Sequence, residues 1–187
     1  FGSGAVATFS MVTSANPVGV TYTTPGAKTV QLSITGPGGC VVTQSNVITI
    51  NPSPVASFTS TAPQCVGSAV NFTNTGSTGA GTTYSWSFGS GATPATSTTQ
   101  NPAGIMYSTA GTKTVTQTVS NNFGCVTTST QTITINQTPV ASFSSTAPSC
   151  TGSLVDFQNT GTSSGATYAW NFGSGATPAT STTQNPT

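Results

Sequence analysis

Short runs in which apolar and polar residues alternate recur along the chain, separated by clusters of glycine, proline and asparagine. Between residues 54 and 136 the apolar members of these runs are Ala56/Phe58, Val70/Phe72, Tyr84/Trp86/Phe88, Ile105/Tyr107, Val115/Val119 and Ile133/Ile135. Because alternate residues of a strand point to the same side, each run predicts a half-buried β-strand. No stretch shows the apolar stripe and caps of a helix. We expect an all-β fold with six or seven short strands per unit, the pattern of an antiparallel Greek-key sandwich.

The pattern repeats with a period close to 85 residues. The segment that begins Pro-Val-Ala-Ser-Phe at Pro54 returns at Pro139. A period of this length is the size of a small domain and not of a solenoid turn. The sequence predicts the C-terminal half of a repeat in 1–51, a complete repeat in 54–136 and the N-terminal half of a repeat in 139–187. We expect the chain to be a window on a longer polypeptide.

The ordered motifs of the complete repeat point to a family. They are Tyr84-Ser-Trp86-Ser-Phe88-Gly89-Ser90-Gly91, then Asn101-Pro102, then Tyr107 to Val115, then Val119-Ser-Asn and finally Ile133-Thr-Ile135. This series resembles a PKD (polycystic kidney disease) repeat of the kind found in large secreted surface proteins of Bacteroidota-type bacteria. The resemblance implies tandem Ig-like/PKD antiparallel β-sandwiches. The family often has an aspartate where Ser3, Ser90 and Ser174 stand, so no role of that aspartate is carried over to this chain.

The composition excludes several classes of function. The 187 residues include two Lys or Arg, one Asp or Glu and no His, whereas about a quarter of an average chain is charged. A basic groove for nucleic acid cannot be built from so few cations. General acid–base or nucleophilic chemistry lacks its usual groups, since the one carboxylate is Asp156, which we expect to be solvated. We therefore predict no enzyme, no cofactor and no metal site, and no apolar run is long enough to span a membrane.

The aromatic residues are expected to build the core. Tyr84, Trp86 and Phe88, with Tyr168, Trp170 and Phe172 in the third repeat, occupy alternate positions of one strand. In a sandwich the apolar face of a strand is the inner one. The alternative is a stacking platform for glycans. Phe123, at a predicted hairpin tip, does not follow the alternation and is the candidate contact residue.

Four cysteines occur as two per repeat: Cys40, Cys65, Cys125 and Cys150. They lack the spacing and histidines of a zinc site, so disulfides are expected. In an Ig-like sandwich the hairpins near Cys65 and Cys125 lie at opposite ends, about 20 Å apart, whereas a disulfide needs Cα atoms within about 7 Å. Two kinds of disulfide therefore stay open. One kind links the first hairpin of one repeat to the last hairpin of the next, and the other kind lies within one repeat.

These observations favour a non-enzymatic structural module of an extracellular surface fibre, stalk or adhesin. Its surface has few charges, and because lysines normally guard exposed sheet edges against pairing, we expect association with other copies of the chain or with neighbouring repeats. The two lysines, Lys28 and Lys113, are expected to lie exposed in turns. The alternative is a module that binds glycans or proteins. The predicted location is secreted, at the cell surface. The two half-repeats would be completed by further covalent sequence or by other chains.

Overall fold

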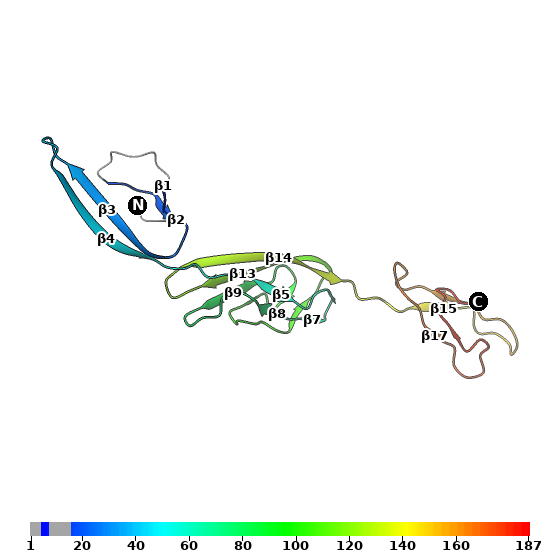
Figure 1. The fold of residues 1–187 in the computed structure, drawn as a ribbon. Helices are drawn as coiled ribbons and strands as arrows, with labels where there is room; N and C mark the ends of the chain where they lie inside the picture. The colour runs from blue at the N-terminus through cyan, green and yellow to red at the C-terminus, as the bar shows by residue number, and fades with distance from the viewer. Residues whose placement is uncertain (1–4, 8–15) are drawn as a thin grey trace. The chain divides into compact units, whose positions relative to one another are not determined.

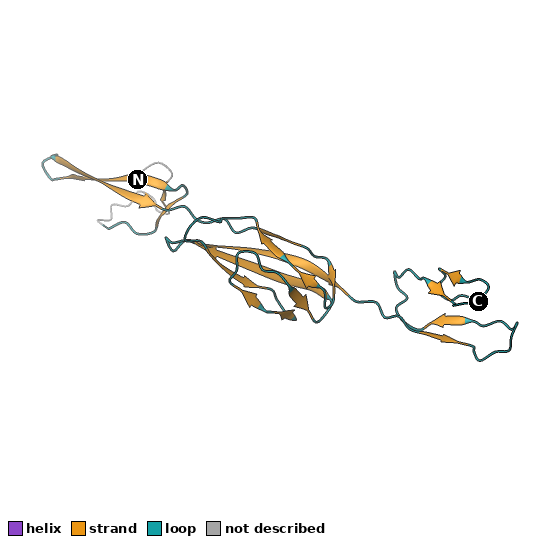
Figure 2. Ribbon diagram, turned by 90° about the horizontal axis from the view of Figure 1, so that it is seen from below, coloured by secondary structure: helices purple, strands orange, loops and turns teal. Residues whose placement is uncertain are grey.

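The computed structural model describes residues 5–7 and 16–187, and within these residues every regular element is a β-strand (Figures 1 and 2). This confirms the all-β prediction. The chain forms two compact units that are divided between Ile135 and Asn136. In the described ranges no helix is long and apolar enough to cross a membrane. Ser3, one of the positions at which the family often has an aspartate, lies outside these ranges.

The complete repeat is a sandwich of ten strand segments. They are β5 (Phe58–Ser60), β6 (Gln64–Cys65), β7 (Ala69–Val70), β8 (Phe72–Asn74), β9 (Thr83–Ser87), β10 (Ala92–Thr93), β11 (Thr96–Ser97), β12 (Ile105–Tyr107), β13 (Gly111–Ser120) and β14 (Val126–Asn136). One sheet has the order β11-β9-β13-β14-β6, a second has the order β10-β12-β7, and β5 pairs with β8. Figure 1 shows β13 and β14 running side by side along the repeat.

The strand count differs from the prediction in a consistent way. The alternating runs all become strand segments or flank them, but β13 and β14 have 10 and 11 residues and are not short. The additional segments, β6, β10 and β11, have two residues each. A two-residue strand segment forms where two stretches of backbone lie close together. It is too short to show an alternating apolar pattern, so the sequence does not predict it.

The core lies between the sheets and is largely aromatic. The ring centroids of Phe58 and Trp86 are 5.1 Å apart in an edge-to-face contact, and those of Phe72 and Phe88 are 5.1 Å apart in a stacked one. Such aromatic pairs add about 0.5–1.5 kcal/mol to the hydrophobic stabilisation. The buried cluster consists of Phe58, Val70, Phe72, Trp86, Phe88, Ile105, Tyr107, Val115, Ile133 and Ile135.

The N-terminal segment has the strands of the second half of the complete repeat. Its strands are β1 (Ala5–Ala7), β2 (Val20–Tyr22), β3 (Gly26–Thr35) and β4 (Val41–Ile50). Strand β1 pairs with β2 in the way that β10 pairs with β12, since Ala5 lies opposite Tyr22 and Ala92 opposite Tyr107. The β3–β4 hairpin has the register of β13–β14 at an offset of 85 residues, with Gly26 opposite Ile50 where Gly111 lies opposite Ile135.

The C-terminal unit has the strands of the first half. Its strands are β15 (Phe143–Ser145), β16 (Phe157–Asn159), β17 (Trp170–Asn171) and β18 (Thr180–Ser181), and they pair as β15-β16 and β17-β18. The loop that follows is held as in the complete repeat: the Asn159 backbone N–H donates to Asn185 Oδ1 at 2.9 Å, as that of Asn74 does to Asn101 Oδ1.

The two lysines are buried, which corrects the expectation that they are exposed in turns. Lys28 and Lys113 lie in β3 and β13, and only about 6% and 5% of their surfaces are exposed. Each Nζ donates a 2.7 Å hydrogen bond to a threonine hydroxyl four residues earlier, on Thr24 or Thr109. The long aliphatic stem allows a lysine to pack against apolar neighbours while its ammonium reaches a polar partner.

The complete repeat and the C-terminal unit each contain one glycine that close backbone packing requires. A Cβ on Gly76 would collide with the carbonyl oxygen of Val55, and a Cβ on Gly161 would collide with that of Val140. The backbones approach this closely because Ser77 N–H donates to Val55 O at 2.9 Å, which closes the edge of the sandwich. The same contact recurs between Thr162 N–H and Val140 O.

Candidate functional site

The C-terminal unit leaves a broad apolar surface uncovered. A hollow of about 670 Å³ opens on it. We call this surface the open face; its aromatic members are Phe143, Phe157, Tyr168, Trp170 and Phe172. Phe143 is 61% exposed, whereas its counterpart in the core of the complete repeat, Phe58, is 2% exposed. The open face therefore corresponds to a sandwich core without its second half.

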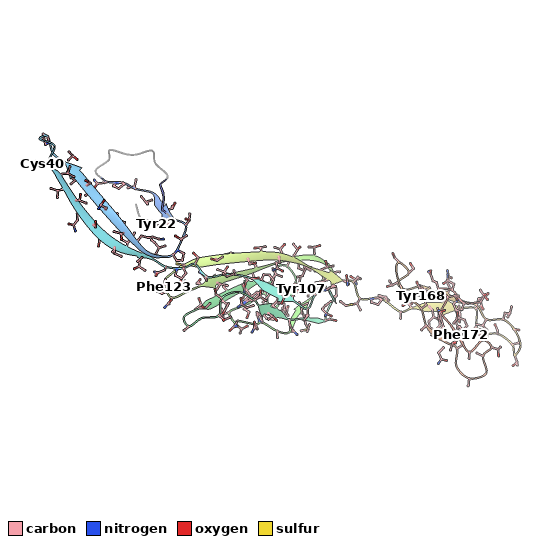
Figure 3. All side chains as sticks on the ribbon, in the orientation of Figure 1. Tyr22, Cys40, Tyr107, Phe123, Tyr168 and Phe172 are labelled. Atoms are coloured by element: carbon pink, nitrogen blue, oxygen red, sulfur yellow. The ribbon has the colours of Figure 1, made fainter. Side chains whose placement is uncertain are left out.

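The rings of the open face are already arranged as in the closed core. Phe143 and Trp170 have centroids 5.3 Å apart, against 5.1 Å for Phe58 and Trp86. The Phe157–Phe172 distance is 5.0 Å, against 5.1 Å for Phe72 and Phe88. Trp170 Nε1 donates to Thr183 O at 2.9 Å, as Trp86 Nε1 does to Thr99 O. The indole of Trp170 is thus held in the same way as that of Trp86 in the closed core. Tyr168 and Phe172 are labelled in Figure 3.

The candidate aromatic residues of the complete repeat lie inside it. Trp86 and Phe88 are buried, with 1% and 0% of their surfaces exposed. Tyr84 is half-buried, and its hydroxyl donates to Ser77 O at 2.8 Å. A ring whose faces are covered by other core side chains cannot stack on a sugar, so Trp86 and Phe88 do not offer a glycan platform.

The N-terminal segment also has exposed apolar side chains, on the strand that corresponds to β13. On β3 the residues that match the core side of β13 are Lys28, Val30, Leu32 and Ile34. Leu32 and Ile34 are 57% and 60% exposed, whereas Val119, which corresponds to Ile34, is fully buried. We call Val30, Leu32 and Ile34 the β3 face.

The β13–β14 hairpin ends in a tightly hydrogen-bonded tip. Asn121 Oδ1 accepts 3.1 Å hydrogen bonds from the backbone N–H groups of Phe123 and Cys125. Gly124 adopts a φ of 79°, which a residue with a Cβ rarely does. Phe123, the predicted contact residue, lies at this tip with 56% of its surface exposed (Figure 3). Asn121 Nδ2 also donates to Pro52 O at 2.9 Å, so the tip holds the linker that enters the repeat.

The motif order, the sandwich and its core agree with one family. The family model described as "PKD domain" matches residues 51–135. Residues 51–135 are a PKD domain. The chain thus belongs to this family through its complete repeat, as the sequence motifs predicted. The PKD domain is a non-catalytic, Ig-like structural module that is typical of extracellular or secreted bacterial proteins.

Two solved structures were also compared with the chain. The PKD1 domain of Vibrio anguillarum Epp is 30% identical and covers 47% of this chain and 99% of its own, with a TM-score of 0.40. The PKD1 domain of the Vibrio cholerae metalloprotease PrtV is 36% identical and covers 46% of this chain and 99% of its own, with a TM-score of 0.38. The comparison with curated proteins gave no match.

The cysteines of the PKD domain lie at its two ends. None of the four cysteines is disulfide-bonded; Cys40 and Cys150 are exposed, and Cys65 and Cys125 are half-buried. Gly67 N–H donates to Tyr107 O, which places β6 and Cys65 near the start of β13, whereas Cys125 follows the tip at the end of β13. The 10 residues of β13 span about 33 Å, well beyond the roughly 7 Å that a disulfide allows. This geometry excludes a Cys65–Cys125 bond within the domain.

A small polar group is enclosed in the PKD core. Gln117 Nε2 donates to Asn74 Oδ1 at 2.7 Å, and Asn74 Nδ2 donates to Ser77 O at 3.3 Å. Gln117 Oε1 is buried and has no hydrogen-bond partner. An unpaired buried acceptor costs about 1–3 kcal/mol. The period of two places Gln117 on the inner face of β13 with Val115 and Val119, but no local pattern shows that Asn74 is its partner.

Tyr107 and Lys113 form the other polar contact at the edge of the core. The Tyr107 hydroxyl donates to Phe88 O at 2.9 Å, and burial raises the pKa of Tyr107 to about 12. Lys113 Nζ lies 5.9 Å from the centre of the Tyr107 ring. A neutral phenol that donates to a backbone carbonyl is a structural group. Among the described residues no three His, Cys, Asp or Glu side chains come together as metal ligands would.

Proposed function

We propose that the chain is a non-enzymatic structural segment of an extracellular surface fibre or stalk. It would consist of tandem PKD units, with half-repeats in 1–51 and 139–187 on either side of the complete domain 54–136, and it would act by contacting other copies and neighbouring repeats. The observation that supports this best is the combination of a closed aromatic core with an outer surface of hydroxyls and amides. Such a domain offers shape and contact area and no reactive group.

The outer face of β13 and β14 illustrates this surface. The hydroxyls of Thr116 and Thr130 lie 3.2 Å apart, and those of Thr118 and Thr128 lie 3.4 Å apart. Cross-strand threonine pairs stabilise a sheet by about 0.2–1 kcal/mol each. Neutral hydrogen-bonding surfaces can pack laterally without desolvating ions, whereas charged edges keep sheets apart. A net charge of +1 further favours association.

The joint before the PKD domain supports a stiff arrangement. Pro52 and Pro54 restrict the linker backbone to extended conformations. The hydrogen bond from Asn121 Nδ2 to Pro52 O then ties the linker to the hairpin tip. A restrained linker is what a spacer needs, because free hinges would let successive domains collapse onto each other.

Electron microscopy of a tandem array tests this proposal. We expect regular rods whose length rises in proportion to the number of repeats, and no enrichment on a glycan array. Arrays that behave as flexible strings of beads, or that bind a glycan saturably, would contradict the structural role.

A binding function is the second candidate, because Phe123 is exposed on an ordered tip. Rigid exposed aromatic rings are typical contact residues in interfaces. The matched variants are Phe123→Ala, which removes the ring, and Phe123→Tyr, which keeps it. A saturable ligand that is lost with Phe123→Ala and kept with Phe123→Tyr would favour an adhesin over a spacer.

The cysteines are proposed to link successive repeats. In a tandem array the Cys65 end of one PKD domain faces the hairpin-tip end of the next, where the counterpart of Cys125 lies. Thiol–disulfide exchange with a low-molecular-weight disulfide such as oxidised glutathione forms one protein disulfide and releases two molecules of reduced thiol. Non-reducing peptide mapping of an array of complete repeats should find first-hairpin and last-hairpin peptides of adjacent repeats joined. Four free thiols per 187 residues after oxidation would contradict this.

A further inference from the structure

The outer edge of β14 in the complete PKD domain is largely unpaired. Strand β14 has 11 residues, whereas β6, its neighbour on the side away from β13, has two. Strand β6 lies near the start of β13, which pairs with the last residues of β14. Residues 126–130 of β14 therefore have no strand on their outer side in the described part of the chain. We call these residues the β14 edge.

The register of the β13–β14 hairpin shows which backbone groups point outward at the β14 edge. Asn121 N–H donates to Cys125 O at 3.1 Å, so these two residues form a hydrogen-bonded pair. In an antiparallel ladder such pairs alternate with pairs whose N–H and C=O groups point away from each other. The short hydroxyl distances across two of these alternate pairs agree, because side chains lie closer there. The residues of β14 with outward N–H and C=O groups are Val126, Thr128 and Thr130.

The β14 edge lacks the features that normally prevent edge pairing, which are charged residues, prolines and bulges. Residues 126–130 include no charged residue and no proline. Each residue of β13 lies opposite one residue of β14, so no bulge interrupts the ladder. Val126 adds an apolar side chain with 58% of its surface exposed. We propose that the β14 edge pairs in antiparallel orientation with the β14 edge of a second copy of the chain, which joins two five-stranded sheets into one.

A second copy fits the β14 edge because the edge is self-complementary. With the two Thr128 residues opposite each other, Val126 of each copy lies opposite Thr130 of the other. All residues with outward backbone groups are then in hydrogen-bonded pairs, so each free N–H and C=O group of the edge gains a partner. This is the isologous contact of a two-fold dimer. No like charges meet in it, since the charged residues of the chain lie elsewhere, at Lys28, Lys113 and Asp156.

Pairing at the β14 edge leaves the core of the domain closed. Next to the edge, Gln131 Nε2 donates to Phe58 O at 2.9 Å, which joins β14 to the strand β5 of the other layer. Phe58 itself is 2% exposed. The second copy thus contacts backbone groups and outer side chains only. Because these groups are already held in strand geometry, little ordering of the chain opposes the pairing.

A single edge contact is weak, and repetition of the edge strengthens it. Residues 126–130 are far fewer than the about 20–30 residues on each side of a standard interface. The first repeat has an equally uncharged edge segment, with Val41, Thr43 and Ser45 at the positions that match the residues with outward groups. In an array the second contact forms at a high effective concentration. Association should therefore be weak for one repeat and should rise steeply with the number of repeats.

This inference deepens the proposed structural role and rests on it for the expectation that copies lie side by side. The first test traps the contact in the full chain with its four cysteines replaced by serine. Thr128→Cys places a thiol where two copies meet, and the control Thr114→Cys places one at an exposed position of β13, away from the edge. Paired Cα atoms lie about 5.5 Å apart, within disulfide range. With oxidised glutathione, Thr128→Cys should form dimers at least tenfold faster than the control; equal rates, or no dimers, would overturn the proposal.

The second test measures hydrogen exchange of the full chain at low and at high concentration. The amides of Thr128 and Thr130 should exchange at least threefold more slowly at high concentration, whereas that of Ser129, which already faces β13, should not change. Thr128→Lys guards the edge with a charge and should abolish this protection. Thr114→Lys, the control, adds the same charge on β13 and should keep it. Exchange at Thr128 and Thr130 that does not depend on concentration would overturn the proposal.

The outcomes separate the two proposals. If neither trapping nor protection is found but tandem arrays still form rods, edge pairing is overturned and the structural role stands. If Thr128→Cys is trapped and its amide neighbours are protected but arrays bind a glycan saturably, the structural role is contradicted and edge pairing stands.

Discussion

At the scale of single residues, the core of the PKD domain combines an aromatic cluster with buried polar side chains, among them Tyr107, Lys113 and Gln117. Tyr107 and Lys113 each have a hydrogen-bond partner, whereas Gln117 Oε1 has none. Buried polar groups with partners are close to neutral in free energy, and those without partners are costly. Substitutions at these three positions therefore distinguish the contribution of packing to the free energy of unfolding from that of polar contacts.

Replacing Gln117 by leucine tests the cost of the unpaired acceptor. Leucine has a similar size, and the first repeat already has Leu32 at the corresponding position. We expect the free energy of unfolding to stay the same or to rise by about 1 kcal/mol, since the lost bond to Asn74 is offset by removal of the orphaned oxygen. Gln117→Ala, the control, should lower it by about 2–4 kcal/mol through a cavity. Urea titration measures both; a loss above about 2 kcal/mol for Gln117→Leu would contradict the argument.

Tyr107 predicts how stability changes at alkaline pH. Its folded pKa of about 12 lies above the usual value of 10 because burial disfavours the phenolate. Between these values the unfolded chain loses the proton first, so the contribution of Tyr107 is complete below pH 10 and is lost as pH rises toward 12. The free energy of unfolding should fall by up to about 1.4 kcal/mol per pH unit in this window.

The control for this prediction is Tyr107→Phe. This variant keeps the ring and removes the titrating hydroxyl, together with its bond to Phe88 O. We expect it to be less stable at pH 8 and to show a flatter decline between pH 10 and 12, as followed by urea unfolding at several pH values. An equally steep decline in the variant would assign the effect to other groups.

At the scale of elements, the long β13–β14 hairpin does more than pair two strands. Its inner face closes the core and its outer face carries the threonine pairs, while its tip binds the linker through Asn121. Two functions meet in the Asn121 side chain: Oδ1 orders the tip, and Nδ2 holds the linker. Asparagine provides an acceptor and donors in one group, which no other side chain of this length does.

Two substitutions separate these functions of Asn121. Asn121→Asp keeps the acceptor and removes the donor, so the tip should stay ordered while the linker at Pro52 is released. Asn121→Ala removes both and should destabilise the tip by about 1–3 kcal/mol. Hydrogen exchange checks this: the amides of Phe123 and Cys125 should exchange faster in Asn121→Ala only. Faster exchange of both amides in Asn121→Asp would show that the tip depends on the linker contact.

At the scale of the whole molecule, the pattern of one continuous repeat is enough to give a closed aromatic core in residues 54–136. The outer surface of this domain consists of hydroxyls and amides, as the threonine pairs of β13 and β14 show. Because neutral sheet surfaces can pack together without desolvating ions, we place the proposed contacts between neighbouring repeats on this outer surface.

Peptide mapping of an oxidised array of complete repeats tests the assembly at this scale. If successive repeats are linked end to end, Cys65 of one repeat should form a disulfide with the counterpart of Cys125 in the next repeat. A Cys65–Cys125 peptide from a single repeat would contradict the arrangement, because the length of β13 separates these two residues.

Much of the fold follows from local pattern. The alternation at Tyr84, Trp86 and Phe88 predicts both the strand and its inner face, because a period of two leaves one side apolar whatever the strand pairs with. The repeat offset predicts which segments are equivalent, and the near absence of charge predicts neither nucleic-acid binding nor most kinds of catalysis. The family follows from the order of these motifs along the chain.

Other features depend on contacts between residues far apart in sequence. The period of two places Lys113 on the same face of β13 as Val115, but its burial depends on Thr109 and the Tyr107 ring, which meet it across a turn. Gln117 is enclosed because Asn74 approaches from another strand. The separation of Cys65 from Cys125 depends on the full length of β13. Strands, faces, repeats and family follow from local periodicity and from the order of motifs, so the sequence is sufficient for them. The burial of polar groups and the separation of the cysteines depend on tertiary packing, because it brings together residues that no local pattern connects.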